Sequence, residues 1–150
     1  MVVHRLGEFL VADYYTQFSA VIGPFSAKAA TWLTDELTRA TADEDDTLGC
    51  EWEIQTQGPL NNPQVPTATL WVHSFEWGNL NLLDDILTKY LEKFAPNESI
   101  TIEWGNSCSK PRPDGFGGGA MVITATKTYS MNTSNWIDKT LKGLKKGAKK

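Results

Sequence analysis

The chain has 150 residues, of which 41% are hydrophobic and 11% aromatic, so it is long enough to bury the core of one domain. The formal net charge is −4, but residues 139–150 hold six lysines and no acidic residue. Residues 1–138 therefore carry 8 basic against 18 acidic residues, about −10, which argues against wrapping duplex nucleic acid. We expect one domain over residues 1–138 and a basic, flexible tail over 139–150 that is available to an anionic surface.

The sequence predicts neither a metal site nor a membrane span. The two cysteines, Cys50 and Cys108, lack the CxxC or His/Cys spacing of zinc sites. No apolar stretch reaches 18 residues, and residues 1–10 lack the apolar run and cleavage site of a signal peptide. We therefore expect a cytoplasmic protein with two free thiols and no metal or cofactor.

The first half of the chain alternates strand and helix patterns. Residues 9–22 are rich in aromatic and β-branched types and predict a strand. Ser26 is a suitable N-cap for a helix that the acidic run at 43–46 ends. Strands are predicted at 50–56, where polar and apolar residues alternate, and at 67–75, where both faces are apolar. The intervening segment, residues 58–66, is rich in proline and asparagine and predicts a loop.

The second half begins with the clearest helical pattern, over residues 80–95, which Pro96 ends. Residues 100–104 alternate as a strand, and residues 120–129 predict a fifth strand after a glycine-rich loop. A last helix should begin near Thr133 or Ser134. Its apolar residues are expected to face inward: Trp136, Ile137, Leu141 and Leu144.

The predicted order is β-α-β-β-α-β followed by a fifth strand and a C-terminal helix. The first six elements match the split βαβ order of a ferredoxin-like fold, an antiparallel α+β sheet covered by helices on one side. Trp52, Ile54, Ile100 and Ile102 should face these helices. The opposite face should carry Trp71, His73, Phe75, Glu51, Glu53 and Glu103.

Aromatic residues on an open sheet face are typical of RNA-binding sheets, but the neighbouring glutamates would repel phosphates. A peptide, a cationic ligand or a second copy of the protein fits this face better. The competing interpretation is that the last helix, or a dimer mate, simply covers it.

The segment 104–119 contains unusual backbone chemistry. Pro111 and Pro113 should hold Lys110 and Arg112 outward in extended conformations, and the glycines leave no Cβ in the way. The functional interpretation is a nest of backbone amides that binds an anion beside the two cations. Its candidate residues are Cys108, Lys110, Arg112, Gly117, Gly118 and Gly119. The structural interpretation is a β-bulge, or a tryptophan that packs on bare backbone.

No catalytic residue is assigned, and an enzyme is the less favoured class. A nucleophile pair of Cys108 and His73, oriented by Glu103 or Asp114, can be drawn, but the spacing neither supports nor excludes it.

Four segments together resemble a family of small bacterial and phage- or plasmid-borne proteins for which no activity is established. These segments are residues 15–22, 70–73, 103–112 and 116–120, and the specific part is the block CSKPR…FGGGA. The resemblance spans roughly residues 13–137. It implies a cytoplasmic protein encoded on a mobile element, and it assigns no functional residue.

These observations favour a non-enzymatic binding module that acts through a protein partner or by self-association. Its sharpest form is a phage- or plasmid-encoded inhibitor of a host defence system, in which acidic patches occupy a partner's basic surface by mimicking nucleic-acid phosphates. The patches are Asp43 to Asp46, Glu51 with Glu53, and Asp84 with Asp85. The alternative is a small anionic-ligand binder, or an enzyme, centred on residues 108–119.

Overall fold

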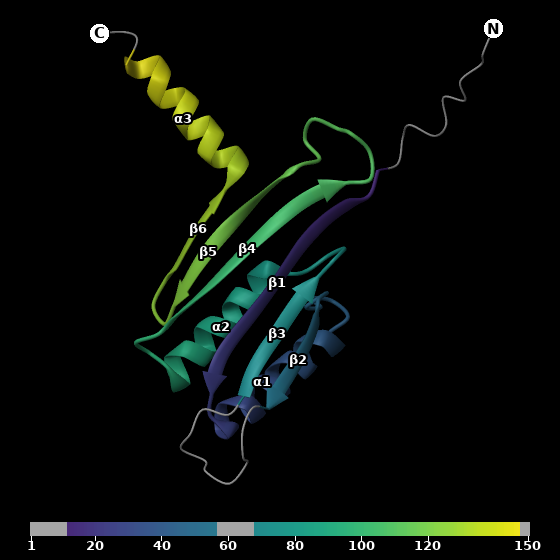
Figure 1. Cartoon of the computed structure of the whole chain (residues 1–150), viewed down its shortest axis with the longest axis vertical. Coiled ribbons are helices and arrows are strands. Elements are labelled where there is room, and N and C mark those ends of the chain that lie inside the picture. Colours follow the sequence, from purple (N-terminus) through teal and green to yellow (C-terminus); the bar gives the residue numbers. More distant parts are fainter. Residues whose placement is uncertain (1–11, 57–67, 148–150) are drawn as a thin grey trace, which may run out of the picture.

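The computed structural model describes residues 12–56 and 68–147 of the chain. Within these ranges, six antiparallel strands form one sheet with three helices, an α+β fold (Figure 1). The elements are β1 (Tyr14–Phe25), α1 (Ala27–Ala42), β2 (Glu51–Thr56), β3 (Ala68–Ser74), α2 (Leu80–Phe94), β4 (Ser99–Cys108), β5 (Gly117–Thr124), β6 (Thr128–Asn132) and α3 (Thr133–Gly147). The strands lie in the order β2-β3-β1-β4-β5-β6. No helix in the described ranges is long and apolar enough to cross a membrane.

The first two helices lie where the sequence predicts them. The Ser26 side chain accepts a hydrogen bond from the amide of Ala29, and α1 ends one residue before the acidic run. The side chain of Asn79 caps α2 in the same way, through the amide of Leu82. Both helices therefore begin at residues that satisfy otherwise unpaired backbone amides.

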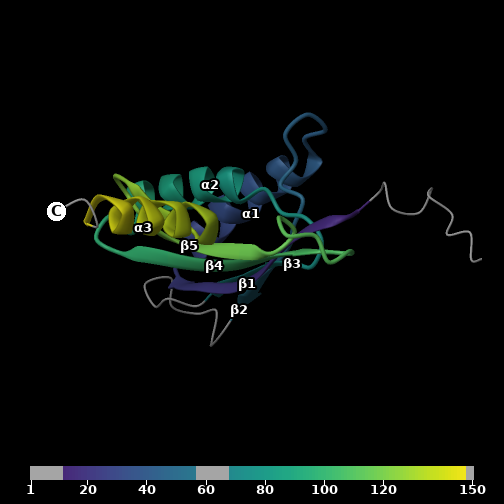
Figure 2. The ribbon, with the colours of Figure 1, turned by 90° about the horizontal axis from the view of Figure 1, so that it is seen from above.

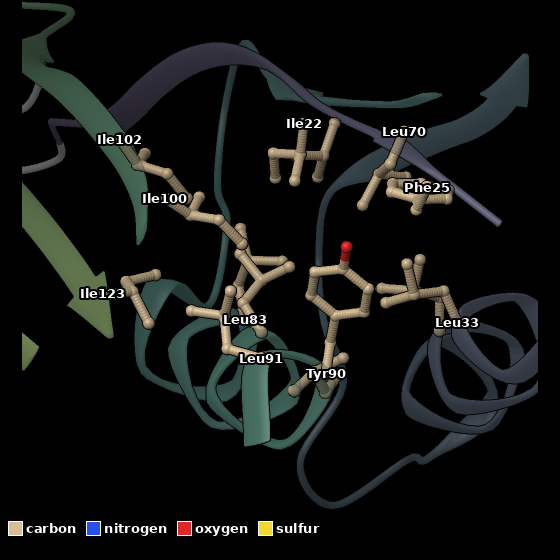
Figure 3. Close-up of a cluster of buried hydrophobic side chains, with 14 of the residues drawn as sticks. Ile22, Phe25, Leu33, Leu70, Leu83, Tyr90, Leu91, Ile100, Ile102 and Ile123 are labelled. Atoms are coloured by element: carbon tan, nitrogen blue, oxygen red, sulfur yellow. The ribbon is translucent and has the colours of Figure 1, made fainter. Parts of the chain in front are cut away.

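The core lies between one face of the sheet and the helices α1 and α2 (Figure 2). Leu83, Leu87 and Leu91 of α2 are fully buried, and Figure 3 shows Leu83 and Leu91 beside the isoleucines of β4 and β5. Burying each such leucine contributes roughly 1.5–3 kcal/mol. The Tyr90 ring meets the edge of Phe25, with centroids 5.6 Å apart, and so links α2 to the end of β1. The predicted inward positions of β4, Ile100 and Ile102, are confirmed.

The prediction of one fifth strand over residues 120–129 is wrong, because two strands, β5 and β6, occupy this region. Thr124 makes a tight turn between β5 and β6: its hydroxyl donates to the carbonyl of Lys127 at 2.6 Å and accepts from the Lys127 amide at 3.0 Å. A threonine turn of this kind contains neither glycine nor proline, so no residue typical of turns marks the end of β5.

The other strand boundaries also differ from the prediction. Strand β1 runs through Phe25 instead of ending at residue 22, with a shift of its register against β3 after Ile22. Strand β4 continues to Cys108, four residues beyond its predicted end. Residues 9–11 of the predicted first strand and the predicted loop at 58–66 lie outside the described residues.

The inward-facing prediction for the last helix is wrong. No described residue of α3 is buried, and the exposed fractions of Trp136, Ile137, Leu141 and Leu144 are 58%, 48%, 50% and 66%. The helix extends away from the end of β6 instead of lying along the core (Figure 1). Apolar periodicity predicts that a helix has an apolar face, but it does not say what covers that face. Residues 139–147, assigned above to a tail, form the second part of α3.

The junctions before β2 and α2 are packed together. The amide of Leu48 bonds to the carbonyl of Ala40, and the amide of Asn79 bonds to the carbonyl of Leu48, both at 2.9 Å. Gly49 has φ +65°, and a Cβ there would collide with the ring of Trp77. This position therefore requires glycine both for its backbone conformation and for the space that the indole occupies.

We expect Gly49→Ala to lower the free energy of unfolding by about 1–3 kcal/mol, because it adds left-handed strain to a steric clash. Urea denaturation followed by far-UV circular dichroism measures this. Gly143→Ala is the matched control, because nothing lies within 4 Å of its Cβ position, and it should not lower stability. Equal stabilities of the Gly49→Ala variant and the wild type would contradict the packing of Trp77 on Gly49.

Candidate functional site

The sheet face opposite the helices is open in the described part of the chain. Figure 2 shows α1, α2 and α3 on the same side of the sheet. On the opposite face, Trp71 of β3 pairs with Val21 of β1 and Glu53 of β2. Two residues along β3, His73 pairs with Glu51 of β2. The structure therefore brings together five of the predicted face residues, in the combination of aromatic and acidic groups that the sequence predicts: Trp71, His73, Phe75, Glu51 and Glu53.

Polar and aromatic contacts hold this row in place. The ring of His73 stacks on Trp71 with centroids 4.0 Å apart and meets the edge of Phe75 at 6.4 Å. The indole nitrogen of Trp71 donates to the hydroxyl of Ser19 at 3.0 Å. The Nε2 atom of His73 lies 3.6 Å from a carboxylate oxygen of Glu51, whose side chain is 85% exposed. The row is thus an ordered surface that leaves a carboxylate accessible.

Two shallow hollows lie on either side of His73 and Phe75. One, of about 330 Å³, extends to Cys50, Glu51 and Trp77, and the other, of about 320 Å³, extends to Gln17 and Trp71. Both volumes are at the small end of the range for ligand pockets. Phe75, 76% exposed, stands between them. Such a surface suits the side chains of a docking segment better than an enclosed small molecule.

The open face continues across the other half of the sheet with residues that the sequence analysis did not assign to it. Val122 of β5 pairs with Thr101 of β4 and Tyr129 of β6. Val21, Val122, Tyr129 and Met131 are all exposed. In a single strand over 120–129, Val122 and Tyr129 would point to opposite faces, and the turn at Thr124 is what places them side by side. Glu103, the sixth predicted residue, belongs to this half, where it pairs with Ala120.

The loop candidates gather around the end of β4. The half-buried Cys108 ends the strand, and a Cβ at Gly115 would lie 2.5 Å from the Cβ of Cys108. The loop is closed by a hydrogen bond from the Ser109 amide to the carbonyl of Asp13. Lys110 and Arg112 are half-buried, so they are less exposed than their expected outward placement implies. The backbone explains their placement, because the Arg112 amide bonds to the carbonyl of Lys110 at 2.8 Å and folds the loop back.

The three consecutive glycines lie inside the sheet. Gly117, Gly118 and Gly119 belong to β5 and pair with residues of β4. A Cβ at Gly118 would collide with the carbonyl oxygen of Trp104, and one at Gly119 would collide with the Trp104 ring. Successive amides of a strand point in opposite directions, so they do not converge on one anion. Close packing on Trp104 accounts for two of these glycines, and an anion site at this loop stays a prediction.

We expect Gly118→Ala to lower the free energy of unfolding by about 1–3 kcal/mol, because the methyl group has no space. Gly105 is the matched control, since it faces Gly118 in the β4–β5 ladder and nothing lies within 4 Å of its Cβ position. Gly105→Ala should change stability by no more than about 0.5 kcal/mol. Thermal and chemical denaturation of both variants measure the difference. Equal effects at the two positions would contradict the packing explanation.

The structure does not bring Cys108 and His73 together. Cys108 pairs with Tyr14, and His73 pairs with Ser19, on opposite sides of β1. Five residues along a strand correspond to roughly 17 Å. Both cysteines are free thiols, and burial raises the pKa of Cys50 to about 11, which keeps that thiol protonated at neutral pH. Among residues 12–56 and 68–147, no cluster of metal-ligating side chains occurs.

Several acidic patch residues have local structural partners. Asp43 accepts hydrogen bonds from the amides of Asp45 and Asp46, both at 3.0 Å, in the turn after α1. Asp84 accepts from the hydroxyl of Thr128 at 2.6 Å, which joins α2 to β6. These carboxylates stabilise the fold, whereas Glu51 and Glu53 lie on the open face.

A hollow of about 570 Å³ near the start of α2 was missed by the sequence analysis. Its lining comes from five separate parts of the chain, and it includes Thr16, Asn79, Asp84 and Asn106. Many of its polar groups bond to each other or to backbone, as Thr16 does to Asn106 at 3.3 Å. Groups that already have partners offer a ligand little net gain. No spacing of residues in the sequence could have predicted this hollow.

Comparisons with protein-family models, curated proteins and solved structures found no match. The resemblance of the CSKPR…FGGGA block to phage- and plasmid-borne proteins therefore stays a prediction. Residues and geometry, above all those of the open sheet face, are the basis for a functional proposal.

Proposed function

We propose that the protein is a non-enzymatic binding module that binds a protein partner through its open sheet face. One observation carries this proposal: Trp71, His73 and Phe75 form an ordered aromatic row directly beside the carboxylates of Glu51 and Glu53. Aromatic side chains that are already held in place lose little entropy on binding. The glutamates add selectivity for a partner with positive charge.

The chemistry of the face defines the partner. Exposed apolar side chains favour a segment with an apolar surface, since burying them on binding removes them from water. The carboxylates repel nucleic-acid phosphates, as the acidic body of the chain also does. The two hollows beside His73 have the size of sites for individual side chains. A cationic segment with exposed apolar residues meets all three conditions.

Two finer proposals accompany this function. We propose that β1 to β4 with α1 and α2 form a ferredoxin-like unit, which the order β4-β1-β3-β2 and the antiparallel pairing support. We also propose a cytoplasmic, phage- or plasmid-encoded inhibitor of a host defence system, in which the acidic face would occupy a basic surface of the target. The sequence resemblance and the acidic body support this second proposal.

The test is capture of a partner from an extract of the host cell, followed by binding measurements with both proteins purified. We expect the double variant Glu51→Lys/Glu53→Lys to bind the partner at least about tenfold more weakly than the wild type, because it replaces attraction with repulsion. Isothermal titration calorimetry measures the affinity, and circular dichroism confirms the fold.

Asp85→Lys/Glu92→Lys is the matched control, since it makes the same charge change at exposed positions of α2. This control should bind within about twofold of the wild type. An equal loss of affinity in both double variants would show that the overall charge of the protein causes the effect. That result would contradict a site on the open face. Loss only in Lys110→Ala/Arg112→Ala would place the site at the loop 108–119 instead.

A further inference from the structure

Helix α3 is amphipathic and has no covering surface within the described chain. At 100° per residue, its apolar side chains share a sector of about 140°. They are Trp136, Ile137, Leu141 and Leu144, and each is about half exposed or more. Lys142 lies opposite this sector, while Lys139 and Lys145 border it on either side. The helix therefore presents an apolar strip with a lysine along each edge.

Such a helix gains little stability alone. An isolated helix of 15 residues is marginal in water, and most helices in proteins depend on packing of an apolar face. Its start is fixed, since Asn132 accepts a hydrogen bond from the amide of Asn135 at 2.8 Å, and the Thr133 hydroxyl accepts one from Gly118 at 3.2 Å. Beyond this start, Trp136 and Lys139 line a hollow of about 290 Å³ together with Trp104 and Met131 of the sheet. The four apolar side chains still stay about half exposed or more, so most of the apolar strip is available to another surface.

The open sheet face has the complementary chemistry. It carries exposed apolar side chains on three strands, Val21 on β1, Val122 on β5 and Tyr129 on β6. Carboxylates accompany them: Glu53 on β2, which pairs with Trp71 of β3, and Glu103 on β4. The apolar strip of α3 fits the apolar side chains, and its bordering lysines fit the carboxylates. One chain thus exposes both halves of a matched pair of surfaces.

In this fold, the apolar strip of α3 cannot reach the open sheet face of its own chain. Helix α3 lies on the same side of the sheet as α1 and α2, whereas the open face lies on the other side (Figure 2). The hydrogen bonds at Thr133 and Asn135 hold the start of the helix on its own side. The surface that α3 meets must therefore belong to another molecule.

An anionic membrane is the main competing occupant, because a lysine-rich amphipathic helix also suits a lipid surface. The charge of the remaining chain acts against it, since residues 1–138 carry about −10 and would be repelled by anionic lipids. The same acidic charge favours contact with a lysine-bordered helix. Charge therefore separates the two occupants, and it favours protein over lipid.

We propose that α3 of one copy lies on the open sheet face of a second copy, with its apolar strip against Val21 and Val122 and its bordering lysines near the glutamates. This inference rests on the proposed function of the open face and names a partner for it. Reciprocal exchange of the two helices closes a symmetric pair, in which each copy contributes one helix and one face to each of two identical contacts.

Sedimentation velocity over a wide range of protein concentration tests this with three full-length variants. Leu141→Asp places a carboxylate in the apolar strip, and Val21→Lys places a lysine on the open face; both residues are exposed, at 50% and 71%, so the fold should persist. Asp85→Lys, at an exposed position of α2 on the side of the sheet away from the open face, is the control. We expect a wild-type dimer, at least about tenfold weaker association of each surface variant, and no change in the control.

Mixing the two surface variants gives the decisive result. The helix of the Val21→Lys variant and the face of the Leu141→Asp variant are both intact, so the mixture should associate more tightly than either variant alone. A dimer weakened only by Leu141→Asp would indicate helix against helix, and one weakened only by Val21→Lys would indicate face against face. Either result overturns the inference.

A wild type that stays monomeric at every concentration also overturns the proposed self-association. Binding of the monomeric protein to anionic phosphatidylserine vesicles, abolished by Leu141→Asp, would overturn it as well. The proposed function has a separate readout, because a partner captured from the host extract would still lose affinity for the Glu51→Lys/Glu53→Lys variant. Failure of self-association alone therefore leaves that function standing, and loss of both effects removes it.

Discussion

Packing of α1 and α2 against a single face of the sheet is the interaction on which the rest of the structure depends. The fully buried leucines of α2 meet the inward residues of β1, β3, β4 and β5, and each strand alternates between this core and the opposite face. Because the side-chain period of a strand is two, burying one face fixes which residues the other face presents. The aromatic row and the glutamates of the open face are therefore set by the register of the core.

This one-sided arrangement leaves apolar side chains exposed in two places. Val21, Phe75 and Tyr129 lie on the open face, and α3 carries four more. Exposed apolar residues are common singly, but an ordered group beside specific charges is typical of binding surfaces. The glycines of β5 have a packing role, because they let the backbone pass close to Trp104. The fold and the candidate site thus follow from the same packing constraint.

Local signals predicted the parts of the fold that local chemistry determines. The caps of α1, the ends of α2 and the alternation of β2 follow from single side chains and short periods, and so do the faces of Trp71 and Glu51. The turn at Thr124 was missed because a threonine hydroxyl replaces the usual turn residues there. The contacts of α3 and the position of Gly118 depend on residues distant in sequence, so no local pattern determines them.

Hydrogen exchange, measured by mass spectrometry at low and high protein concentration, most directly tests whether α1 and α2 form the core and α3 lies outside it. At low concentration, amides of α2 should exchange slowly, because their opening requires loss of the core, while amides of α3 should exchange within the fastest measured times. Raising the concentration should slow exchange in α3 and leave α2 unchanged. Protection of α3 equal to that of α2 at every concentration would show that α3 packs within its own chain, and would contradict the one-sided burial on which both proposals rest.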